Sequence, residues 1–297
     1  MAYGLWVAVQ YGMLHLGLEV APEGRTADIL FFGSAAASAF FGFFLTSTVL
    51  VHAEGPFSEH PSTRKVYVLA ALTVGLIGSV VIKAAGATAP VVFIIHSAHL
   101  LVFAVLLGAW LATAVRRLAE IVLLCVLMLW VDFLSVFLGP TRYLARTISD
   151  YYRGGRQGPV PWSDLLLVKT VVPGLENPYP IFGVSDWIII VFLSAAAARF
   201  QVDDNIAGKG LGPMTADRKV SLYISVPLLG LLVSLLVAQL TASFIPALSV
   251  ISLLFLCHIY ARYRPLVQME RRDWAAILVF TAVAVLVIGV QVFRWIH

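Results

Sequence analysis

Residues 119–138 read AEIVLLCVLMLWVDFLSVFL. This stretch is long and apolar enough to cross a bilayer as a helix, because a hydrocarbon core of roughly 30 Å needs about 20 apolar residues in helical form. One residue sets it apart from an ordinary membrane span, since Asp132 lies among apolar neighbours. The stretch therefore predicts a membrane helix that carries an acid.

Eight further runs of the chain are long and apolar enough to span a bilayer. They cover residues 3–20, 29–53, 66–86, 89–115, 181–199, 221–241, 243–260 and 274–295. The composition agrees, because 60% of the residues are hydrophobic and only 12% are charged, whereas soluble domains carry about 25% charged residues. We therefore expect an all-α, polytopic membrane helix bundle with about nine transmembrane helices, in an integral, multi-pass membrane protein.

One long connection divides the predicted helices. Residues 1–138 form an N-terminal helical bundle that ends in the helix carrying Asp132, residues 139–180 form a long hydrophilic loop, and residues 181–297 form the C-terminal helices. The loop contains a semi-apolar run at 165–172 that is too short to span. Because this run is partly β-branched, it could lie at the membrane surface, offer a strand edge to a partner, or pack as an ordinary surface loop.

The remaining composition indicates neither a nucleic acid partner nor a cofactor. The net charge is +4, but the cations lie at helix ends and in connections, as membrane anchoring requires. Cys125 and Cys257 fall inside apolar runs without metal-type or redox spacing, so we expect both to be buried in the core. His96 and His99 share a helix face, but no third ligand follows at a suitable spacing, which favours a packed, hydrogen-bonded pair over a metal or haem site.

Two acids inside apolar runs carry the functional information, Asp132 and Asp186. An acid near the centre of a span costs about 2.5–3.5 kcal/mol on insertion scales, so it usually faces a protein interior or water and has a function. Alternatively, such an acid is wetted and inert near a helix end. If the two helices are antiparallel neighbours, the carboxylates could face each other and share a proton, which leaves one acid and one base for aspartic-protease chemistry.

Three short segments resemble the presenilin and signal peptide peptidase family of intramembrane aspartyl proteases. Residues 132–140 read DFLSVFLGP, like the first aspartate segment of the family. Residues 183–186 read GVSD, like its Gly-x-Gly-Asp motif, and residues 246–248 read PAL, like its Pro-Ala-Leu motif. The resemblance covers about residues 120–260. It departs from the family at Val131, where the family usually has Tyr, and at Ser185, where it has Gly.

The resemblance implies an aspartic endopeptidase that hydrolyses peptide bonds of transmembrane or membrane-proximal substrates. Asp132 and Asp186 would be its catalytic pair. The residues implied to bind substrate are Gly183, Ser185, Pro246, Ala247 and Leu248. The expected partners are a transmembrane peptide and the lipid bilayer, and an oligomer remains open. A helical substrate would have to unwind locally, and it could pair with the 165–172 run.

Two other functions remain open on the same residues. Membrane-buried carboxylates also relay protons, so Asp132 and Asp186 could serve a proton-coupled transporter or channel. Ser185 adds bulk and a hydroxyl beside Asp186, so the chain could also be a catalytically inactive, protease-like membrane scaffold.

Overall fold

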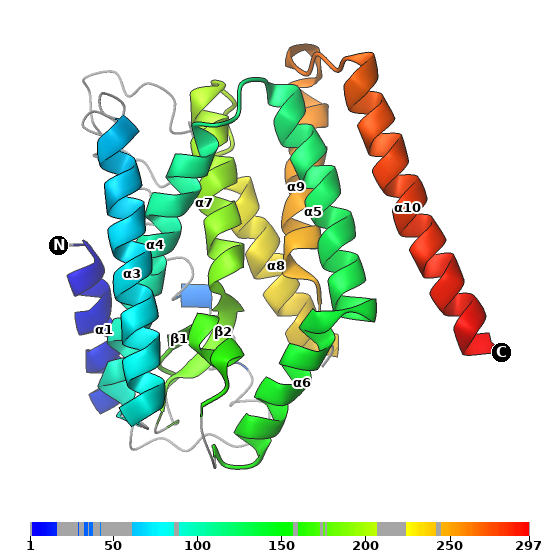
Figure 1. Cartoon of the computed structure of the whole chain (residues 1–297). Helices are drawn as coiled ribbons and strands as arrows, with labels where there is room; N and C mark the ends of the chain where they lie inside the picture. Colours follow the sequence, from blue (N-terminus) through cyan, green and yellow to red (C-terminus); the bar gives the residue numbers. More distant parts are fainter. Residues whose placement is uncertain are drawn as a thin grey trace. The chain divides into compact units, whose positions relative to one another are not determined.

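The structure of the chain is a computed structural model (Figure 1). It describes residues 2–16, 29, 33–34, 36–37, 42, 61–85, 89–156, 160–172, 175, 177–206, 224–241 and 245–296. These residues are mostly helical, which confirms the all-α prediction. The one sheet within them has two short strands.

Eight of the nine predicted runs correspond to helices, and the ninth, 29–53, lies mostly outside the described residues. The helices at these runs are α1 (Ala2–Leu16), α3 (Pro61–Ala85), α4 (Pro90–Ala112), α5 (Leu118–Leu138), α7 (Val184–Arg199), α8 (Val226–Thr241), α9 (Ala247–Arg262) and α10 (Arg271–Ile296). A further helix, α6 (Pro140–Arg153), begins the predicted long loop. It follows α5 after a single residue, Gly139, which is extended. The two helices are separate because the residue before a proline disfavours the α conformation.

Within the described residues, four helical segments are long and apolar enough to cross a membrane. They are Lys65–Ala84, Pro90–Ala112, Leu118–Val136 and Arg271–Val290. The helices α1, α7, α8 and α9 have only 15 or 16 residues. A helix of 16 residues is about 24 Å long, less than a hydrocarbon core of roughly 30 Å. The prediction of about nine transmembrane helices is therefore not confirmed.

The chain divides into two compact units that interleave along the sequence. The first contains residues 1–112 and 147–195, and the second contains residues 113–146 and 196–297. In the first unit α4 packs against α1, α3 and the sheet. Close contact of α4 with α7 requires Gly108, because a Cβ there would lie 2.7 Å from the backbone oxygen of Ile188.

The stretch predicted as a long loop contains ordered elements besides α6. A 3-10 helix, η1 (Trp162–Leu166), leads into strand β1 (Leu167–Thr170), which pairs antiparallel with β2 (Tyr179–Gly183). Leu167 pairs with Gly183 and Thr170 with Tyr179. Strand β2 runs directly into α7, so the sheet lies next to the start of the helix that carries Asp186.

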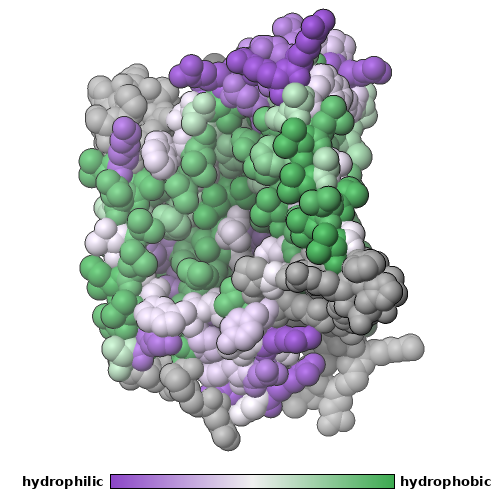
Figure 2. Space-filling view, turned by 45° about the vertical axis from the view of Figure 1, so that its right-hand side comes forward, coloured by the Kyte–Doolittle hydropathy of each residue, from purple (hydrophilic) through white to green (hydrophobic). Residues whose placement is uncertain are grey.

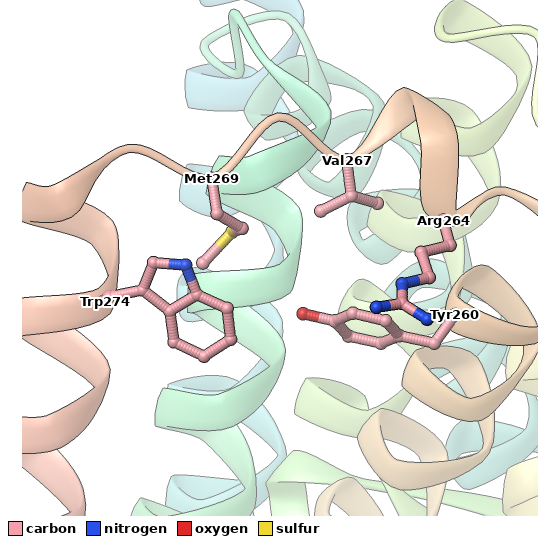
Figure 3. Close-up of a pocket in the computed structure, with 5 residues that line it drawn as sticks. All are labelled: Tyr260, Arg264, Val267, Met269 and Trp274. Atoms are coloured by element: carbon pink, nitrogen blue, oxygen red, sulfur yellow. The ribbon is translucent and has the colours of Figure 1, made fainter.

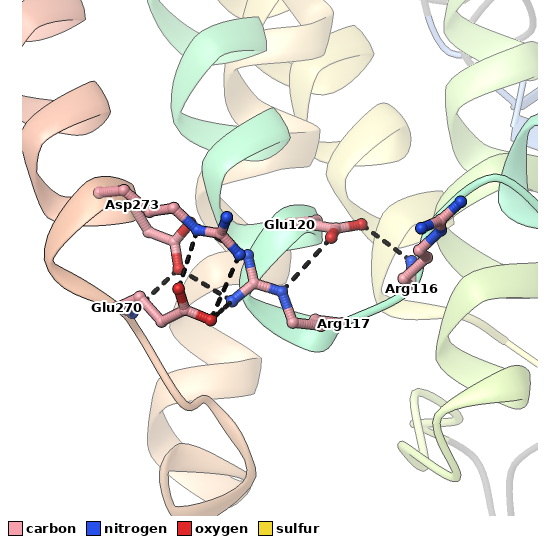
Figure 4. Close-up of polar contacts among 6 residues, drawn as sticks. Arg116, Arg117, Glu120, Glu270 and Asp273 are labelled. Atoms are coloured by element: carbon pink, nitrogen blue, oxygen red, sulfur yellow. Dashed lines mark hydrogen bonds and ion pairs between the residues drawn. The ribbon is translucent and has the colours of Figure 1, made fainter.

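In the second unit α9 packs against both α5 and α8, and α10 packs against α5 (Figure 1). Helices α8 and α9 approach closely at Gly230, where a Cβ would lie 2.6 Å from the Cα of Ile251. The start of α10 is tied to α5 by ion pairs of Arg117 with Glu270 and Asp273 (Figure 4). The buried end of this network is Asp273, whose side chain is 7% exposed.

Large apolar side chains are exposed along α3 and α10, and hydrophobic surface is prominent in Figure 2. On α10, for example, Leu278 and Leu286 are each 67% exposed. Contiguous apolar exposure of this kind is unusual on a soluble protein and is the normal state of a helix that faces lipid. The four long helices and this exposed surface support a membrane protein.

One core prediction is wrong and one is confirmed. Cys125 is buried, but Cys257 is exposed on α9, because an apolar run does not distinguish a core-facing side from a lipid-facing side. The prediction that His96 and His99 are packed and hydrogen-bonded is confirmed. His96 Nε2 bonds the carbonyl oxygen of Leu165 at 2.8 Å, and His99 Nε2 bonds that of Ala71 at 2.8 Å.

Candidate functional site

Asp132 lies within α5, and its carboxylate meets the start of α9. The backbone N–H of Ser249 donates a hydrogen bond to Asp132 Oδ2 at 3.0 Å. The Ser249 hydroxyl donates a second bond to the carbonyl oxygen of Leu129, one turn earlier on α5, at 2.9 Å. Ser249 is buried and Asp132 is half-buried. These two bonds fix the carboxylate against the first turn of α9.

This contact unites two of the three motif segments. Pro246 is the residue before α9, with φ −69° and ψ 100°, and Ala247 and Leu248 form the first two positions of the helix. The first backbone N–H groups of a helix have no partner within it. Here the carboxylate of Asp132 satisfies one of them from another helix. Asp132 therefore lies at the start of α9, the segment that follows Pro246 and begins with Ala247 and Leu248.

Asp186 lies at the start of its own helix, α7, and not in the body of a helix as Asp132 does. It is the third residue of that helix, and its Oδ2 accepts a hydrogen bond from the backbone N–H of Gly183 at 3.0 Å. A carboxylate at this position that reaches back to the residue before the helix is half of a capping box. Asp186 is half-buried, and Ser185 beside it is exposed.

Gly183 is the residue at which β2 becomes α7. A Cβ there would lie 3.2 Å from Ser185 Oγ and 3.4 Å from Asp186 Oδ2, so a larger residue would press on the Ser185 hydroxyl and touch the carboxylate at van der Waals distance. The structure thus brings Gly183, Ser185 and Asp186 together at the end of the sheet. Asp186 lies near the start of α7, which is also the position expected for an inert acid that only caps its helix.

The two aspartates belong to different compact units, Asp186 to the first and Asp132 to the second. Each has its own group of neighbours from the implied site. Meeting of the two carboxylates, which the proteolytic hypothesis requires, stays a prediction.

Most of the semi-apolar run at 165–172 is buried, and its residues 167–170 form β1, although Leu166 is 56% exposed. Leu165, Val168 and Val171 are each at most 2% exposed. Two backbone N–H groups of this region are already bonded: that of Lys169 donates to Ser97 Oγ at 2.9 Å, and that of Val171 to Gln10 Oε1 at 2.7 Å. This region therefore does not offer the strand edge that one of the sequence hypotheses assigned to it.

A buried ionic cluster holds the same region in place, and sequence reasoning missed it. Lys169 pairs with Asp164, and the Tyr152 hydroxyl of α6 donates to Asp164 Oδ1 at 3.0 Å. Burial lowers the pKa of Lys169, although the Asp164 carboxylate opposes this shift. Burial and the same carboxylate raise the pKa of Tyr152. The only signal in the sequence was the presence of Asp164 and Lys169 at the ends of an otherwise apolar run.

Comparisons with protein-family models, curated proteins and solved structures find no match to this chain. Two carboxylates, each oriented by a backbone N–H at a helix start, could act as acid and base if they meet. Among the described residues, no group of three or more His, Cys, Asp or Glu side chains could hold a metal ion.

Proposed function

We propose that this chain is a multi-pass intramembrane aspartyl protease that hydrolyses peptide bonds of transmembrane or membrane-proximal substrates. Asp132 and Asp186 are its catalytic carboxylates. The substrate site is formed by two segments, one around Gly183 and Ser185 and one around Pro246, Ala247 and Leu248. The resemblance to presenilins and signal peptide peptidases motivates this proposal, and the local geometry of each aspartate supports it.

The observation that carries the proposal is the bond between Asp132 and Ser249. These residues are 117 positions apart in the chain, and nothing in the packing of two apolar helices requires a carboxylate between them. An acid placed among apolar helices is usually retained for a function. An extended substrate that lies along the backbone of residues 246–248 would come next to the Asp132 carboxylate.

The arrangement around Asp186 supports the second half of the site. Strand β2 ends at Gly183, three residues before Asp186. A peptide that adds as a strand along β2 would therefore run past this carboxylate. We assign the addition to β2 because this strand leads directly into the helix that carries Asp186, and main-chain hydrogen bonds would supply the affinity.

Strand addition also solves a chemical problem. The carbonyl groups of a helical substrate are hidden in hydrogen bonds, and they must be freed before a nucleophile can reach them. An unwound segment that pairs with β2 exchanges helical hydrogen bonds for sheet hydrogen bonds, so unwinding leaves few backbone groups unsatisfied.

Two carboxylates that meet would divide the chemistry between them. Like charges at short range keep one carboxyl protonated. The ionised one takes a proton from water, the resulting hydroxide attacks the carbonyl carbon, and the protonated one donates to the carbonyl oxygen. Collapse of the tetrahedral intermediate breaks the C–N bond: the leaving amine takes the proton that the first carboxylate removed from water, and the second carboxylate regains a proton from one hydroxyl of the intermediate.

Cleavage of a model transmembrane peptide by the purified chain in lipid tests the proposal. Asp132→Asn and Asp186→Asn should each abolish cleavage. Asp150→Asn is a matched control, because Asp150 is an exposed acid of α6 outside the three motifs, and this variant should cleave like the unchanged chain.

Other outcomes would reject the proposal. Undiminished cleavage by either variant would remove that aspartate from the mechanism. Proton-coupled flux into liposomes that depends on Asp132, without proteolysis, would identify a transporter. Absence of both activities, together with failure to bind a hydroxyl-containing aspartyl protease inhibitor, would identify an inactive scaffold.

A further inference from the structure

A pocket of about 510 Å³ lies between the end of α9 and the start of α10, within the second compact unit. Its lining residues are Tyr260, Arg264, Val267, Met269 and Trp274. Figure 3 shows Arg264 next to the Tyr260 ring on the α9 side, and Trp274 on the α10 side with Met269 above its ring. The pocket thus combines one cation, two aromatic side chains and apolar walls.

The pocket lies where apolar helices end. Trp274 is the fourth residue of α10, whose segment Arg271–Val290 is long and apolar enough to cross a membrane. Tyr260 is in the last turn of α9, which ends at Arg262. Trp and Tyr at the ends of membrane helices lie at the level of the lipid headgroups, with the ring in the apolar region and the polar atom near water.

The charges around the pocket favour an anion. Residues 262–272 contain four Arg residues and a single acid, Glu270. Glu270 pairs with Arg117 and with Arg272, and the nearby Asp273 pairs with Arg117 at 3.3 Å (Figure 4). The acids are therefore already compensated. Arg264 is exposed, and no acid among the described residues lies within ion-pair distance of it.

The same ion pairs hold the walls of the pocket in place. Arg117, the residue before α5, binds both Glu270, which follows Met269, and Asp273, which precedes Trp274. Met269 and Trp274, which line the pocket, are therefore the sequence neighbours of two residues that are held by ion pairs next to α5. A site whose walls are already ordered loses less conformational entropy when it binds a ligand.

Apolar surface continues from the pocket along both helices. On α9, Cys257 and Leu253 lie three and seven residues before Tyr260, on the same helix face, and both are exposed. On α10, Leu278 lies four residues after Trp274 and is 67% exposed. A ligand with an anionic head in the pocket and a hydrocarbon tail along these side chains fits both surfaces.

We propose that this pocket binds one anionic phospholipid. Arg264 contacts the phosphate, the Tyr260 hydroxyl and Trp274 ring border the headgroup, and the acyl chains lie along Leu253, Cys257 and Leu278. Basic pockets between membrane helices bind anionic lipid headgroups. The inference depends on insertion of the chain into a bilayer, but it does not depend on proteolysis.

Lipid retention by the full chain tests this assignment. The purified protein is titrated with phosphatidylglycerol or with phosphatidylcholine, and bound lipids are counted by native mass spectrometry. Phosphatidylglycerol should bind preferentially. Arg264→Gln should weaken its binding about fivefold, the effect of one lost cation near an anionic lipid. Arg262→Gln is the matched control, because Arg262 is an exposed neighbour that does not line the pocket, and it should change binding by less than about twofold.

Three results would overturn the assignment. Equal retention of the two lipids would show that the site does not select an anion. Equal losses in the two Arg variants would show diffuse attraction by the Arg-rich segment and not a pocket. Displacement of the lipid by the same concentration of inorganic phosphate would show that the acyl chains contribute nothing.

If Arg264→Gln lowers the melting temperature, Arg264→Lys, which keeps the charge, decides the question: it must retain the lipid, and failure to do so rejects the assignment.

Discussion

Ser249 and Asp132 connect α9 to α5 through a hydrogen bond of 3.0 Å from the backbone N–H to the carboxylate. The bond places an acid from the body of one helix at the N-terminus of another. The partial positive charge of a helix N-terminus favours a carboxylate at that position. Position and orientation of Asp132 therefore depend on where α9 begins, and this dependence can be tested through the Ser249 side chain.

Ser249→Ala should lower proteolytic turnover more than it changes the KM for a model transmembrane peptide. The variant keeps the backbone N–H that binds Asp132 but loses the hydroxyl bond to Leu129, which costs about 1 kcal/mol and loosens the carboxylate. Ser234→Ala is the matched control, since Ser234 is also buried in the second unit but its hydroxyl bonds Leu231 within its own helix. It should reduce stability by a similar amount and leave turnover unchanged. Equal losses of turnover in both variants would contradict a positioning role for Ser249.

Gly230→Ala should destabilise the protein by about 1–3 kcal/mol, the usual effect of overpacking. The added Cβ would lie 2.6 Å from the Cα of Ile251, which is backbone and cannot rotate away, so α8 and α9 would have to separate. Gly289→Ala on α10 has open space around the added carbon and should be neutral or stabilising by up to about 1 kcal/mol. Thermal unfolding in one detergent compares the two variants, and the account of the α8–α9 contact fails if both melt alike.

Lys169→Met should destabilise the first unit by about 3–5 kcal/mol, because it leaves the buried Asp164 carboxylate without its cation. The double variant Lys169→Met with Asp164→Leu should recover most of this loss, since well-packed apolar residues often replace a buried ion pair without penalty. Tyr152→Phe removes only one hydrogen bond and should cost about 1 kcal/mol. Melting temperatures report all three effects, and a double variant no more stable than Lys169→Met alone would count against the buried pair as the cause.

The positions of the helices could be predicted from the sequence because they follow from length and hydropathy. The run 119–138 corresponds to α5, Leu118–Leu138, and the run 274–295 to α10, Arg271–Ile296. Orientation about the helix axis could not be predicted in the same way. Cys257 was expected in the core and is exposed, because lipid and protein interior are both apolar.

The candidate site was only partly predictable for a related reason. The motif residues could be found one segment at a time, but the contact of Asp132 with Ser249 joins residues 117 positions apart, and no local pattern encodes it. The partly β-branched run at 165–172 indicated a strand as one option. Its partner, Tyr179–Gly183, has two prolines in or beside it and gives no strand signal of its own.

The proposed proteolysis requires Asp132 and Asp186 to meet around one water-accessible point inside the bilayer. An experimental structure of the chain in a lipid nanodisc with a hydroxyl-containing transition-state inhibitor measures this directly. We predict that both carboxylates lie within about 2.6–3.2 Å of the inhibitor hydroxyl. Carboxylates on opposite faces of their helices, or one of them pointing into lipid with the hydroxyl bound elsewhere, would contradict the account.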